Sequence, residues 1–234
     1  MQYSSELLNL FGAPELSQLN VCGAKELPAL PDFLSAAIWN HLAGAAFPDP
    51  SVQHLDLAFL RRSNAAAEEY RTGRNYLLRY VEGVEAGQHR LGAYLSALTH
   101  FEQCIGAIWQ AAELFNRMEH KILGVTSQRL TIYKPGEKSD LERINSLNNV
   151  AKHFSALQAE QTSTPIWITN REIKCADAAL TFDELYENVV SLSDVARQTF
   201  VEIPSEARAQ RRGNSGSAVA ATKRPNDPSE VPDT

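Results

Sequence analysis

One segment of the chain gathers side chains that could bind a ligand: residues 141–154, Leu-Glu-Arg-Ile-Asn-Ser-Leu-Asn-Asn-Val-Ala-Lys-His-Phe. On a helix, successive side chains are rotated by about 100°, and its polar side chains then gather on one side. These are Glu142, Asn145, Asn149, Lys152 and His153. Because Asn149 and His153 are four residues apart, they are surface neighbours. The sequence predicts a helical stripe that offers hydrogen bonds to a ligand or partner.

The opposite side of the same predicted helix is apolar. It carries Ile144, Leu147, Val150, Ala151 and Phe154. Arg143 falls on this apolar arc, so a buried arc requires its guanidinium to be paired or to reach out to solvent. We expect its partner to be a carboxylate of the two long helices, such as Glu102 or Glu113.

Two long helices must position this segment. From 51 to 83 and from 87 to 121, apolar residues recur at steps of three and four, which is the period of a helix with one buried face. Only Val84–Gly87 connects them. A connection this short predicts an antiparallel helix hairpin whose facing stripes form the core.

Two capping boxes mark the helices that follow. In Ser139-Asp140-Leu141-Glu142, the serine hydroxyl can accept from the third helical amide while Glu142 reaches back to the cap. This helix should run to about 160. Thr181-Phe182-Asp183-Glu184 opens a closing helix with an apolar stripe that continues to 200. Between the two, β-branched and aromatic residues around an Asn turn predict a small β-hairpin at 165–175.

These elements predict an all-α fold: a helical bundle built on a long antiparallel helix hairpin, with a small β-hairpin near 165–175. Residues 1–50 contain five prolines, so we expect short helices there, at 4–11 and 32–44, packed with loops on the body. Residues 51–203 form the helical domain. Residues 204–234 lack aromatic side chains and are rich in small residues and proline, which predicts a disordered tail.

Composition narrows the classes of function. The net charge of -6 disfavours a long electrostatic contact with nucleic acid. No apolar run is long enough to span a bilayer, and the N-terminus lacks the basic start of a secretory signal, which predicts a cytoplasmic protein without a membrane anchor. Three separated cysteines predict reduced thiols. The six histidines form no i, i+4 pair, so we expect no metal site. The common nucleotide-binding motifs are absent as well, and we expect no cofactor.

Asn148-Asn149-Val150-Ala151-Lys152-His153, preceded by two long helices, resembles the motif helix of the HEPN superfamily. These are small α-helical domains, many of them in prokaryotic toxin-antitoxin and phage-defence systems. The resemblance covers mainly 51–160. It implies a homodimer paired through this helix, with Asn145, Asn149 and His153 near the cleft.

In the ribonuclease members, the motif is an arginine followed by a histidine after four to six intervening residues. The resemblance implies that the arginine holds the scissile phosphate and that the histidine moves a proton at the ribose 2′-hydroxyl. Here Asn148 stands where the arginine would be, and nine residues separate Arg143 from His153. Under this resemblance, the candidate catalytic residues are His153, Asn149, Asn148 and Arg143.

Three hypotheses remain open. The leading one is a non-catalytic HEPN-like module that binds a partner protein or a nucleotide-containing ligand, as part of a toxin-antitoxin or phage-defence system. The second is a metal-independent endoribonuclease in which His153 acts with Arg143, or with Arg74 or Arg117 across a dimer. The third is a helical scaffold protein in which His153 makes only a local hydrogen bond.

Overall fold

The computed structural model of the chain describes residues 16, 18–42, 49–124, 132–157, 166–175 and 178–199, without the side chains of 40, 41 and 152–157. The predicted helix at 4–11 and the predicted disordered tail at 204–234 lie outside these residues. Within them, the fold is an all-α bundle with one small sheet. None of the described helices is long and apolar enough to cross a membrane.

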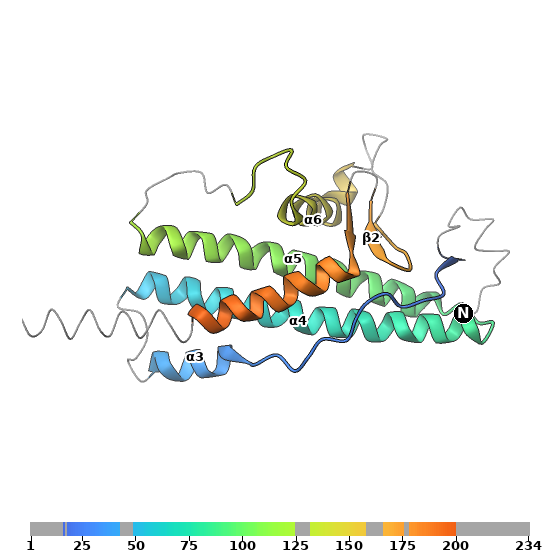
Figure 1. Ribbon diagram of the computed structural model, residues 1–234, viewed down its shortest axis with the longest axis horizontal. Helices are drawn as coiled ribbons and strands as arrows, with labels where there is room; N and C mark the ends of the chain where they lie inside the picture. Colours follow the sequence, from blue (N-terminus) through green and yellow to red (C-terminus); the bar gives the residue numbers. More distant parts are fainter. Residues whose placement is uncertain are drawn as a thin grey trace, which may run out of the picture.

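A long helix hairpin forms the body of the molecule, as the sequence predicts. Helix α4 (Pro50–Glu85) and helix α5 (Leu91–Ile122) run antiparallel side by side (Figure 1). Helix α4 begins where Pro50 occupies the first turn and the Asp49 carboxylate accepts from the Ser51 amide at 2.8 Å. The proline and the cap together explain why the helix starts here, since Pro50 has no amide hydrogen to leave unbonded and Asp49 accepts from one of the free amides.

The connection between the two helices lies later in the chain than predicted. Gly83 is still inside α4, where an added Cβ would lie 2.6 Å from the Gln88 carbonyl oxygen. The chain turns at Gly87, whose φ of 70° favours glycine. Helix α5 therefore starts at Leu91 rather than near 87. Gly83 serves close packing at the turn and does not end the helix.

The two helices approach each other closely in their middle. A Cβ on Gly73 of α4 would lie 3.2 Å from the ring of Phe101 on α5. The Phe101 ring also contacts the rings of Tyr70 and Phe182, with centroids 5.9 and 5.2 Å away. This fully buried aromatic cluster joins the hairpin to the closing helix at 182–199.

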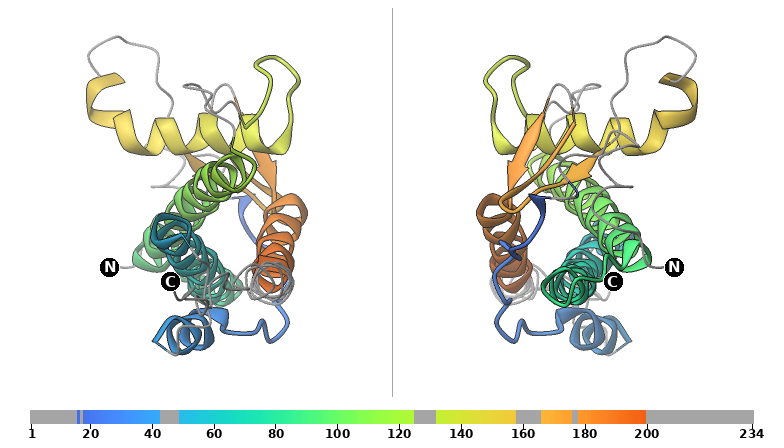
Figure 2. Two further views of the ribbon diagram at one scale, coloured as in Figure 1. Left: turned by 90° about the vertical axis from the view of Figure 1, so that its left-hand side faces the viewer. Right: turned by 90° about the vertical axis from the view of Figure 1, so that its right-hand side faces the viewer.

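The other helices pack around the hairpin. Helix α3 (Phe33–Leu42) packs on α4, which confirms the predicted helix at 32–44. Helix α6 (Asp140–Leu157) packs on α5, and Figure 2 shows that it runs across the hairpin. Residues 182–199 lie in the predicted closing helix, which Figure 1 shows beside the hairpin.

Residues 19–32 form no helix or strand and are tied to the body by hydrogen bonds. The hydroxyl of Tyr70 donates to the Lys25 carbonyl at 3.0 Å, and Arg74 Nε donates to the Ala24 carbonyl at 3.0 Å. The Asn170 side chain accepts from the amides of Asn20 and Val21 at 3.0 Å each. These bonds tie residues 20–25 to α4 and to the turn between β1 and β2.

The predicted β-hairpin is present, and the structure adds a third strand. Strand β1 (Trp167–Ile168) pairs antiparallel with β2 (Glu172–Lys174), which pairs antiparallel with β3 (Ala179–Thr181). Leu180 of β3 faces the core, fully buried, and is paired with Ile173. Strand β3 is not evident from the sequence, because it is only three residues long and its last residue, Thr181, also caps the helix that follows.

Asp56 of α4 is a charged group buried in this bundle. Its side chain is 7% exposed, and Oδ1 has no hydrogen-bond partner among the described residues. Burial raises the pKa of Asp56 from 3.8 to about 6, and a hydrogen bond from Thr199 opposes this shift. The folded state therefore favours the protonated carboxyl group.

This burial predicts a pH-dependent loss of stability. The folded pKa lies above the unfolded one, so Asp56 is tolerated at low pH and destabilises the fold as pH rises from about 4 through about 6. Asp56→Asn should remove this loss and stabilise the protein at pH 7 relative to wild type by about 3 kcal/mol. Urea unfolding of both proteins between pH 4 and 7 measures the difference. Asp194→Asn, an exposed control, should parallel wild type. Parallel curves for Asp56→Asn would contradict the prediction.

Candidate functional site

Helix α6 divides its side chains much as the helical wheel predicts. Ile144 and Leu147 are fully buried, and Val150 and Ala151 pack against the same core. Asn149 is exposed on the other side. Lys152 and His153 lie on α6, but their side chains are outside the described residues. The apolar arc is therefore confirmed for these four residues.

Two members of the polar stripe hold the turn before α6. The Glu142 carboxylate accepts from the amides of Gly136 and Lys138, at 2.6 Å each. Asn145 donates to the Tyr133 hydroxyl at 2.9 Å. The Ser139 hydroxyl caps the helix as predicted, accepting from the Glu142 amide at 3.3 Å. The other half of the predicted box is wrong, because Glu142 reaches past Ser139 to the turn.

Arg143 joins α6 to the closing helix. Its guanidinium donates to both oxygens of Glu184, at 2.8 and 3.1 Å, and to Asp140 at 2.6 Å. A fourth hydrogen bond, at 3.2 Å, reaches the Ala179 carbonyl of β3. The Glu184 hydrogen bonds raise the pKa of Arg143, so its charge is retained. The predicted partner, Glu102 or Glu113, was wrong because the apolar arc faces β3 and the closing helix as well as the hairpin.

The capping box at Thr181 positions this carboxylate. The Thr181 amide donates to Glu184 Oε2 at 2.8 Å, and the Glu184 amide donates back to the Thr181 hydroxyl at 3.2 Å. Both halves of the predicted box are confirmed. The capping box fixes the position of the Glu184 carboxylate, which forms a bidentate ion pair with Arg143.

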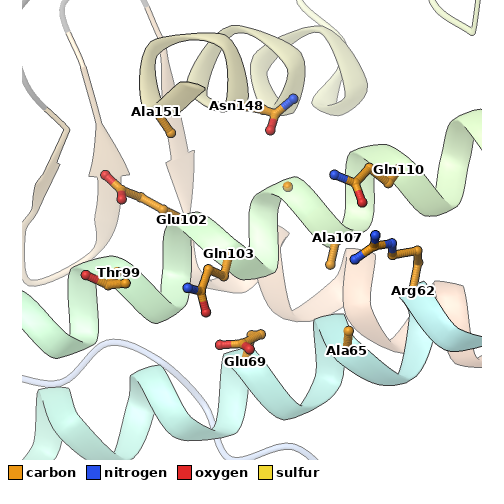
Figure 3. A pocket seen from close by; sticks show the side chains of 11 residues that line it. Arg62, Ala65, Glu69, Thr99, Glu102, Gln103, Ala107, Gln110, Asn148 and Ala151 are labelled. Atoms are coloured by element: carbon orange, nitrogen blue, oxygen red, sulfur yellow. The ribbon is translucent and has the colours of Figure 1, made fainter. Parts of the chain in front are cut away.

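The structure places Asn148 in a groove between α4, α5 and α6. The groove has a volume of about 420 Å³ (Figure 3). Its lining residues come from all three helices: Arg62, Ala65 and Glu69; Thr99, Glu102, Gln103, Gly106, Ala107 and Gln110; and Asn148 and Ala151. Of the candidate site residues whose side chains the structure describes, Asn148 alone lines it.

Small residues leave the space for this groove. Ala65, Gly106, Ala107 and Ala151 line it where larger side chains would fill it. A Cβ on Gly106 would lie 3.3 Å from Asn148 Oδ1, so α5 and α6 approach closely at this point. The absence of that Cβ lets the Asn148 side chain reach into the gap between the helices.

One wall of the groove holds a fixed carboxylate. Glu69 Oε2 lies 2.6 Å from His100 Nδ1, and the His100 ring stacks on Tyr76 with centroids 5.4 Å apart. With its amide nitrogen turned toward α4, Gln103 donates to both Glu69 oxygens, at 2.9 and 3.2 Å. Glu69 is therefore oriented by two neighbours on α5.

Two charged side chains of the groove are without ion-pair partners in the described part of the chain: Glu102 and Arg62. Burial raises the pKa of the Glu102 carboxyl group. Both side chains are half-buried, so each is poorly hydrated and would gain from a ligand of opposite charge.

Two amide atoms of the groove are buried and unpaired. Asn148 is 3% exposed, and its Nδ2 has no hydrogen-bond partner among the described residues. The same holds for Gln110 Oε1. A buried donor or acceptor without a partner costs about 1–3 kcal/mol. Both atoms are themselves covered, so a ligand in the groove can bond them only when the two amide groups turn toward it.

The remaining sequence candidates lie elsewhere. Arg74 is bonded to the N-terminal segment, and Arg117 is exposed on α5. Among the described residues, no group of three or more His, Cys, Asp or Glu side chains could hold a metal ion. The spacing of Asn148 from Ile144 and Ala151 signals its burial, because i+4 and i−3 positions share a face. Nothing in the sequence places Glu69, Glu102 and Arg62 beside it, since they come from different helices.

Two asparagines of α6 give a matched test of this arrangement. Asn148→Leu removes an unpaired buried donor while keeping the same branching of heavy atoms, and it should raise the free energy of unfolding by about 1 kcal/mol. Asn145→Leu loses the bond to Tyr133 and should lower it by about 1 kcal/mol. Urea unfolding followed by circular dichroism measures both. A stability loss in Asn148→Leu equal to that in Asn145→Leu would show that Asn148 has a structural partner.

Comparison with known proteins adds no relative to this description. Neither a protein-family model, nor a curated protein, nor a solved structure matches the chain.

Proposed function

We propose that the chain is a non-catalytic, HEPN-like helical binding module that uses the groove between α4, α5 and α6. The resemblance of 148–153 to the HEPN motif, after two long antiparallel helices, supports the family assignment. It also suggests the setting: a cytoplasmic homodimer that belongs to a prokaryotic toxin-antitoxin or phage-defence system.

The observation that carries the non-catalytic half is the pairing of Arg143. This is the only arginine in the sequence of α6, and two carboxylates hold its guanidinium. Releasing it to bind a phosphate would leave Glu184 without a charged partner, and breaking such a partly buried pair is costly. Asn148, which stands at the motif position, can donate a hydrogen bond but brings no charge to a scissile phosphate.

The groove supports the binding half. Its unpaired amide atoms and charged side chains reduce stability in the free protein, and such groups are retained where a ligand satisfies them. The Glu69 carboxylate already bonds His100 and Gln103, so it is not free to act as a general base. Binding is the function that this set of side chains fits best.

A ribonuclease assay tests the non-catalytic half. Purified protein incubated with end-labelled single-stranded and hairpin RNA in EDTA should leave the RNA as intact as buffer does, because no free arginine of α6 stabilises the cleaved phosphate. His153→Ala should behave like wild type, as should His54→Ala, an exposed control on α4. Cleavage by wild type that His153→Ala abolishes and His54→Ala retains would favour the endoribonuclease hypothesis instead.

A further inference from the structure

The groove carries a polar pattern that runs along α5. Figure 3 shows Glu102 and Thr99 toward one end, Gln110 and Arg62 toward the other, and Asn148 between them on α6. Glu102 and Gln110 are eight residues apart on one helix, which corresponds to about 12 Å at 1.5 Å per residue. An extended polypeptide covers that distance with about four residues at roughly 3.3 Å each.

The unpaired atoms fit the backbone of such a segment. When the amide groups of these two lining residues turn toward the groove, Asn148 Nδ2 can donate to a peptide carbonyl and Gln110 Oε1 can accept from a peptide N–H. A peptide unit offers this pair of groups at every residue, whatever its side chain. The small residues Ala65, Gly106 and Ala107 allow a backbone to come close to the helices.

The charges at the two ends favour a segment with two kinds of side chain. The partly buried carboxyl group of Glu102 fits a basic group, and the half-buried guanidinium of Arg62 fits an acidic one. Two carboxylates, Glu69 and Glu102, line the groove beside one arginine, so a polyanion would meet repulsion. None of the described lining residues is aromatic, so the groove has no platform for stacking a base.

We infer that the groove binds an extended segment of about four residues from a partner protein, with a basic side chain at Glu102, an acidic side chain at Arg62, and a backbone amide at Asn148. The inference rests on the proposed binding function and names its ligand. The two fail separately: RNA cleavage would overturn the non-catalytic proposal, and the absence of peptide binding would overturn this one.

Side-chain amide resonances give a direct readout. The probe is the acetylated and amidated peptide Lys-Ala-Ala-Glu, titrated into ¹⁵N-labelled full-length protein and followed by ¹H–¹⁵N correlation spectra. The Asn148 side-chain NH₂ signals should move as a hydrogen bond forms, while those of exposed Asn149 stay in place. Asn148→Leu should weaken binding about fivefold to tenfold, and Asn149→Leu by less than twofold.

Charge reversal tests the assignment of the ends and cannot be mimicked by misfolding. Arg62→Glu should lose affinity for Lys-Ala-Ala-Glu and gain affinity for Lys-Ala-Ala-Lys, because a carboxylate at position 62 attracts a basic side chain. Glu-Ala-Ala-Glu should bind wild type at least fivefold more weakly than the mixed peptide. Unchanged Asn148 signals with every peptide, or Asn148 signals that move with a tetra-adenosine RNA instead, would overturn the inference.

Discussion

The close packing of α4 against α5 around Gly73 is the constraint on which the rest of the structure depends. A side chain at Gly73 would meet the Phe101 ring, so the two helices can approach only because position 73 has none. Phe101 in turn packs on Phe182, the first residue of the closing helix at 182–199. One aromatic ring therefore sets both the spacing of the hairpin and the place where the closing helix docks.

The polar contacts of α6 follow from that arrangement. Because the closing helix is fixed by Phe182, its capping residue Glu184 lies where Arg143 of α6 can form two hydrogen bonds to it. This pair, with Ile144 and Leu147 buried beside it, holds α6 across α5. The groove is the space that remains where small residues of α4 and α5 face α6, and Asn148 and Ala151 are the residues of α6 that line it. The free-energy cost of leaving Asn148 Nδ2 unpaired is offset by the burial of Ile144 and Leu147 and by the ion pairs of Arg143.

Local sequence signals predicted most of the fold. Helical periodicity predicted the hairpin and the buried arc of α6, and the capping boxes predicted the starts of α6 and the closing helix, because those signals act within a few residues. The turn after α4 was predicted too early in the chain. A glycine at position 83 could either end the helix or allow another segment to pack closely, and only the contact with Gln88 shows that it does the second. Strand β3 was missed because its pairing with β2 is a tertiary choice that three residues do not reveal.

The candidate site was harder to predict for the same reason. A helical wheel separates buried from exposed positions, but it does not say which buried polar group finds a partner. Arg143 found one in Glu184, forty-one residues away in sequence, and Asn148 found none among the described residues. The wheel drew attention to Asn149 and His153, whereas the groove is lined by the neighbouring Asn148 together with charged residues of two other helices.

The central claim is that Asn148 is held unpaired so that it can bond the backbone of a partner segment. A high-resolution crystal structure of the full-length protein grown with the Lys-Ala-Ala-Glu peptide tests this most directly. The account predicts the peptide extended along α5, with one of its carbonyl oxygens within hydrogen-bond distance of Asn148 Nδ2. A groove filled by side chains of the same chain, with Asn148 Nδ2 bonded to one of them, would contradict it.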